Sequence, residues 1–84
     1  MSQRPAPSFL QIVQIHHLQA LLKLGALPNP ATRKPEKPDP DAALHEILLL
    51  EILRSKTVGN LEPEEADLLD ETIASLRAAL DSIP

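Results

Sequence analysis

The C-terminal part of the chain has a simple amphipathic pattern. Its apolar residues are spaced alternately three and four positions apart, which is the spacing of one face of an α-helix. This stripe consists of Ala66, Leu69, Ile73, Leu76, Leu80 and Ile83. Acidic residues, among them Glu64, Asp67 and Glu71, fall on the other face. The pattern predicts a helix over residues 63–81 with one buried side and one solvated side.

Residues 8–24 and 40–57 show a different pattern, in which apolar residues occur on two sides of each predicted helix. The first segment has an inner stripe of Leu10, Val13, His17, Ala20, Leu21 and Leu24, and a second stripe of Ile15, Leu18 and Leu22. The second segment has an inner stripe of Ala43, Ile47, Leu50 and Leu53, and a second stripe of Leu44, Leu48 and Ile52. The surface helix of a small monomer normally has one apolar stripe. We therefore predict an all-α fold of three helices, completed as a homodimeric bundle whose interface is the second stripes.

Local signals place the ends of these helices. Ser8 and Gln11 have the spacing of a capping box, and Gly25 follows the first apolar segment. Asp39 is a good N-cap residue, and Pro40 suits the first helical position that follows it. Residues 26–39 between these signals contain four prolines, which exclude a helix and favour an extended loop.

Residues 56–65 predict a tight joint between the second and third helices, which then form an antiparallel hairpin. Gly59 suits the left-handed conformation that often follows a helix end, and Pro63 suits the first position of the next helix. The residues with a structural role in this joint are Lys56, Thr57, Gly59, Asn60, Leu61 and Pro63. Glu62 stands at the N-cap position, where a longer side chain caps poorly, so we expect the third helix to fray at its start or to lean on Asn60.

The length and composition limit the possible functions. The chain has 84 residues, no cysteine, one aromatic residue and a net charge of −4. These values predict one helical domain over residues 8–84 after a mobile tail at residues 1–7. They disfavour a thiolate metal site, base stacking and nonspecific binding to nucleic acid or to an anionic membrane. No signal peptide and no bilayer-spanning run is visible, so a cytoplasmic protein is expected.

Few residues suggest chemistry. Asp41 and His45 lie one helical turn apart and could both contact a metal ion, but two ligands do not make a site. His17 falls within the inner apolar stripe and is expected to be a packing residue, and His16 is expected to be exposed near Lys23. The acidic residues of the third helix have no apolar surroundings that would raise a pKa. We expect neither an enzyme nor a bound cofactor.

Two blocks of residues resemble a known family. The first is Lys56-Thr57-x-Gly59-Asn60-Leu61-x-Pro63-Glu64-Glu65, followed by Leu68-Leu69. The second is Ala20-Leu21, Leu24-Gly25 and Pro28-Asn29-Pro30-x-Thr32-x-Lys34-Pro35. Together with Phe9 they make residues 9 to 80 similar to the bacterial helical proteins grouped as domain of unknown function 1844 (DUF1844). The chain departs from the family pattern at Glu62, at His16 and His17, and at Leu44 and Leu48.

The resemblance implies a small cytoplasmic bacterial protein and no catalytic residues, because the family has no established activity. Some members lie near translation genes. Three functions therefore remain open. The first is a structural or interaction module that self-associates through the second stripes. The second is a factor associated with translation or the ribosome, whose loop cations Arg33, Lys34 and Lys37 contact RNA. The third is an adaptor whose apolar stripes are covered by a different protein.

Overall fold

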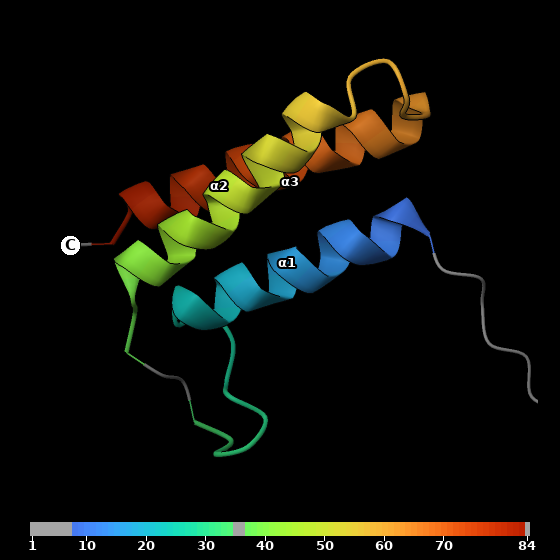
Figure 1. Cartoon of the computed structure of the whole chain (residues 1–84). Helices are drawn as coiled ribbons and strands as arrows, with labels where there is room; N and C mark the ends of the chain where they lie inside the picture. The colour runs from blue at the N-terminus through green and yellow to red at the C-terminus, as the bar shows by residue number, and fades with distance from the viewer. Residues whose placement is uncertain (1–7, 35–36, 84) are drawn as a thin grey trace, which may run out of the picture.

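The computed structural model describes residues 8–34 and 37–83, in which it contains three α-helices and no β-strand (Figure 1). The helices are α1 (Phe9–Lys23), α2 (Pro40–Lys56) and α3 (Pro63–Asp81). The predicted all-α class and the number of helices are confirmed. Their ends lie within one residue of the predicted limits. The expected mobile tail at residues 1–7 lies outside the described residues.

Side chains at the starts of α1 and α2 satisfy backbone groups as their sequences predict. The Ser8 N–H donates to Gln11 Oε1 at 3.1 Å, and the Gln11 N–H donates to Ser8 Oγ at 3.4 Å. The Ala42 N–H donates to Asp39 Oδ1 at 3.1 Å. Each bond satisfies one of the N–H groups that a helix start leaves without an intrahelical partner. At the other end of α1, Gly25 takes the positive φ of 74° that turns the chain out of the helix.

The joint between α2 and α3 forms the predicted hairpin, and the Glu62 N–H at the start of α3 is satisfied by Glu65 rather than by Asn60. Gly59 has a φ of 82°, and Thr57 Oγ1 donates to the Leu53 carbonyl at 2.7 Å. The Glu62 N–H donates to Glu65 Oε1 at 2.8 Å, and α3 begins at Pro63 without leaning on Asn60. The Glu62 side chain makes no cap hydrogen bond, as expected, and Glu65, three residues on, satisfies the Glu62 N–H instead.

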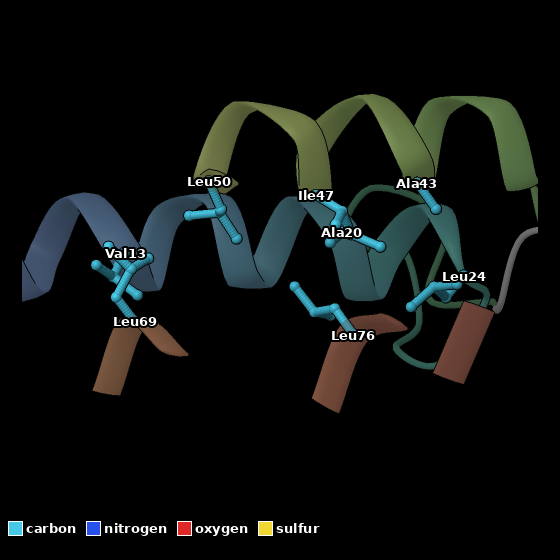
Figure 2. Close-up of a cluster of buried hydrophobic side chains, with 8 residues drawn as sticks. All are labelled: Val13, Ala20, Leu24, Ala43, Ile47, Leu50, Leu69 and Leu76. Atoms are coloured by element: carbon cyan, nitrogen blue, oxygen red, sulfur yellow. The ribbon is translucent and has the colours of Figure 1, made fainter. Parts of the chain in front are cut away.

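The core lies where the inner stripes of the three helices meet, and each helix contacts the other two (Figure 2). The buried hydrophobic residues are Val13, Ala20 and Leu24 of α1 and its end, Ala43, Ile47 and Leu50 of α2, and Leu69 and Leu76 of α3. Ile73, Leu80 and Ile83 pack against this cluster, which confirms the predicted stripe of α3. Leu10, which was assigned to the inner stripe, is instead exposed near the first turn of α1.

Candidate interaction surface

The second apolar stripes of α1 and α2 remain open to solvent in the single chain. Ile15 and Leu18 of α1 are 57% and 53% exposed, and Leu48 and Ile52 of α2 are 43% and 55% exposed. Leu22 and Leu44 complete the stripes and are half-buried. We call these six residues the outer stripes. Because successive residues of an α-helix are about 100° apart, Ile15 and Leu18 point away from Val13 and the core.

One exposed residue next to the outer stripes was missed from the sequence. Ile12 is 44% exposed and precedes Ile15 by three positions, so the two side chains lie on neighbouring parts of the α1 surface. The spacing of 12, 15, 18 and 22 was readable from the sequence. Ile12 nevertheless belongs to neither of the two stripes predicted for residues 8–24. The open apolar surface of α1 is therefore longer than the predicted set.

A polar contact joins α1 to α2. His16 Nδ1 lies 2.8 Å from Glu46 Oε2, and both side chains are partly buried. The expected position of His16, exposed near Lys23, was wrong, because α2 packs along this side of α1 and supplies a carboxylate. The same two helices are joined at their ends, where the Asp39 N–H donates to the Lys23 carbonyl at 2.6 Å. Both contacts show that α1 and α2 run antiparallel (Figure 1).

Two bidentate ion pairs join α2 to α3. Arg54 donates to both carboxylate oxygens of Asp70, at 2.7 and 3.2 Å. Arg77 donates to both carboxylate oxygens of Glu51, each at 2.8 Å. The hydrogen bonds from Arg54 hold the pKa of Asp70 below its usual value, because they stabilise the charged carboxylate. These pairs are exposed and therefore orient the helices more than they stabilise the fold.

The predicted cationic loop leaves α1 and returns to α2 at the same point. The Asp39–Lys23 hydrogen bond closes its base, and the Arg33 N–H donates to the Asn29 carbonyl at 2.7 Å further out. Arg33 has a φ of 58°, which is uncommon for a residue other than glycine. Arg33, Lys34 and Lys37 are all exposed. The structure thus places the three candidate cations on a loop that projects from one end of the helices (Figure 1).

In the part of the chain that it describes, the structure places no further ligand beside the possible metal ligands predicted from the sequence. The described residues contain no group of three or more metal-ligating side chains, and Asp41 and His45 are both exposed. His17 is half-buried beside the core, in line with a packing role. No pocket is found within residues 8–34 and 37–83. Among the described helices, none has the length and apolar character needed to span a bilayer.

Comparison with known proteins identifies the family. The chain matches the model of a domain of unknown function (DUF1844) over residues 6–81, nearly its whole length. Neither the curated proteins nor the solved structures provide a match to the chain. The matched range includes both sequence blocks and all three helices. The chain therefore belongs to the DUF1844 family.

Proposed function

We propose that this protein is a small structural or interaction module that self-associates through the outer stripes of α1 and α2. The observation that carries the proposal is the exposure of Ile15, Leu18, Leu48 and Ile52, each between 43% and 57%. These side chains recur at helical spacing on two packed helices rather than singly. Regularly placed apolar residues on the outside of a small domain are typical of a protein contact surface.

The free energy available from this surface is of the right order for a dimer. Burying a Leu or Ile side chain completely stabilises a complex by about 1.5–3 kcal/mol, so a half-exposed one contributes roughly half as much. Four such residues from each copy together contribute about 6–12 kcal/mol. Association itself costs about 4–15 kcal/mol in lost translational and rotational freedom. The free energy from burial is therefore of the same order as the cost of association.

Light scattering across a dilution series tests self-association directly. The protein concentration must be followed by refractive index, because the chain has no Trp and no Tyr. We expect the mass of a dimer, with dissociation only at the lowest concentrations. A compact monomer at every concentration, with no binding of a hydrophobic dye, would contradict the proposal. A monomer that binds the dye would instead favour an adaptor whose stripes are covered by a different protein.

Substitutions on the outer stripes test where the contact lies. Leu18→Glu and Leu48→Glu each place a carboxylate within an apolar contact, so each is expected to shift the protein to a monomer. Val58→Glu is the matched control, since Val58 is 68% exposed but lies in the joint between α2 and α3. The control is expected to keep the mass of the parent protein. Equal masses for all four proteins would show that the outer stripes are not the interface.

The cationic loop supports a second candidate function, a contact with RNA of the translation apparatus. The supporting observation is that Arg33, Lys34 and Lys37 are all exposed on a loop closed at its base. Cosedimentation with ribosomes at low salt would test it. The double variant Arg33→Glu with Lys34→Glu is expected to lose the association, and Lys56→Glu at the other end of α2 is the control. Retention of the double variant would exclude this use of the loop.

A further inference from the structure

The outer side of α1 differs from the outer sides of the other two helices in its charge. Between Phe9 and Leu22 this helix contains no Asp, Glu, Lys or Arg, and Lys23 is its only such residue. The exposed polar residues next to its outer stripe are the glutamines Gln11, Gln14 and Gln19. By contrast, the exposed side of α3 carries Glu64, Asp67 and Glu71. On α2, Asp41 is exposed and Glu51 lies between Leu48 and Ile52 in sequence.

An uncharged apolar helix face limits what can cover it. A charge of the partner that is buried against it would find no counter-ion on α1, and leaving a buried charge without a partner is costly. The covering surface must therefore be apolar, with neutral polar groups at its margins. Within the described chain, the outer face of α1 itself meets this requirement. Glutamine amides both donate and accept hydrogen bonds, so the margins of two such faces can also pair.

We infer that α1 of a second copy packs antiparallel on α1, with the twofold axis at Leu18. This inference rests on the proposed self-association and specifies its geometry. In a twofold contact the same surface is used by both copies, so the residue at the centre of the face meets its own counterpart. Leu18 has this central place, with Ile15 three residues before it and Leu22 four residues after it.

Electrostatics favour the antiparallel over the parallel arrangement. The macrodipoles of two antiparallel helices attract each other, whereas those of parallel neighbours repel. A parallel arrangement would also bring the two cationic loops to the same end of the dimer, because each loop follows α1 directly. Arg33, Lys34 and Lys37 outnumber the single Glu36 there. With the twofold axis at Leu18, the antiparallel arrangement places the two Lys23 residues, where the loops begin, about 15 Å apart along the helix direction.

Disulfide cross-linking tests this geometry, since the chain contains no cysteine of its own. A disulfide forms only where two Cα atoms lie within about 7 Å. We expect Leu18→Cys to form a covalent dimer under mild oxidation at least about ten times faster than Val58→Cys, because association raises the effective thiol concentration. Ile15→Cys and Leu22→Cys should each react slowly alone. A mixture of these two variants, one of them tagged, should form the mixed disulfide rapidly.

Three results would overturn the inference. Rapid cross-linking of Ile15→Cys and Leu22→Cys each to itself would show a parallel contact. Rapid reaction of Leu48→Cys with slow reaction of Leu18→Cys would place the axis on α2. Equal cross-linking rates for Leu18→Cys and Val58→Cys would show that the disulfides form by random collision and not within a specific contact. Light scattering of each variant shows whether it forms a dimer, and this distinguishes random collision from the two other results. A monomeric parent protein would contradict the proposed function, whereas a dimer without the Leu18 cross-link would contradict the geometry alone.

Discussion

At the scale of single residues, Gly59 is a position where backbone strain can be isolated. Its φ is 82°, and a Cβ added there would have no neighbouring atom within 4 Å. Gly59→Ala is therefore expected to destabilise the fold by about 1–2 kcal/mol through the left-handed backbone alone. Chemical denaturation followed by circular dichroism measures this loss. Gly59→Asn is the control and should lose less, because Asn tolerates this conformation better; an Ala variant as stable as the parent would contradict this account.

Asp70 contributes a pH dependence whose sign follows from its ion pair. Hydrogen bonds from Arg54 lower the pKa of Asp70 in the folded state, so the folded state binds fewer protons than the unfolded state in that range. The contribution is present above the ordinary carboxyl pKa of about 4 and is lost as the pH falls through the lowered value. Asp70→Asn should thus be slightly less stable than the parent at pH 7, and the difference should shrink below about pH 4.

Thermal unfolding at a series of pH values measures this effect. Glu71→Gln is the matched control, because Glu71 is exposed on the same helix and lies outside the three ion pairs of the described residues. The control should change the unfolding midpoint less than Asp70→Asn at pH 7. The effect of Asp70→Asn should also decrease at high salt, since exposed ion pairs are screened. A difference that grows on acidification would contradict the assigned pair.

At the scale of helices, the sequence predicts what depends on local interactions. Ser8, Asp39, Gly25 and Gly59 act within a few residues of their own positions, and the helix ends fall where they predict. The contacts of His16 and of Arg77 could not be predicted from local sequence signals. Their partners, Glu46 and Glu51, lie 30 and 26 residues away and are brought near by packing. Sequence spacing indicates which face a side chain occupies but not which residue of another helix lies opposite.

The inner stripe of α2 can be tested with one substitution made at two positions. Ile47 is fully buried, whereas Ile52 on the same helix is 55% exposed. Ile47→Val removes one buried methyl group and is expected to destabilise the fold by about 0.5–1.5 kcal/mol. Ile52→Val should change stability by less than about 0.5 kcal/mol at concentrations where the copies are separate. Denaturant titrations of both variants measure the difference, and equal losses would mean that Ile47 does not lie in the core.

At the scale of the whole molecule, the candidate surface was largely visible in the sequence. The doubled apolar pattern of residues 8–24 and 40–57 selected Ile15, Leu18, Leu48 and Ile52, all of which are exposed in the single chain. The pattern could not identify what covers them. Hydrophobic burial is non-directional, so an apolar stripe specifies an apolar partner and not its identity. The absence of charged residues from most of α1 is the more selective feature, because it limits the composition of the partner's surface.

Self-association predicts that thermal stability depends on protein concentration. When a dimer unfolds to two separate chains, mass action raises the midpoint of unfolding as the concentration increases. For a chain of this length the rise is about 4 °C for each tenfold increase, given an unfolding entropy of about 2 cal/mol/K per residue. Circular dichroism at 222 nm over a hundredfold range of concentration measures this slope without any aromatic probe. Such a slope would also mean that part of the fold's stability comes from the second copy.

Two variants make this measurement specific. Leu18→Glu should have a lower midpoint that no longer changes with concentration, because a monomer unfolds without a change in the number of molecules. Val58→Glu should keep the slope of the parent protein, since its added carboxylate lies outside the outer stripes. A constant midpoint for the parent over the full range would show that the single chain is stable by itself. The open stripes of α1 and α2 would then need a different protein to cover them.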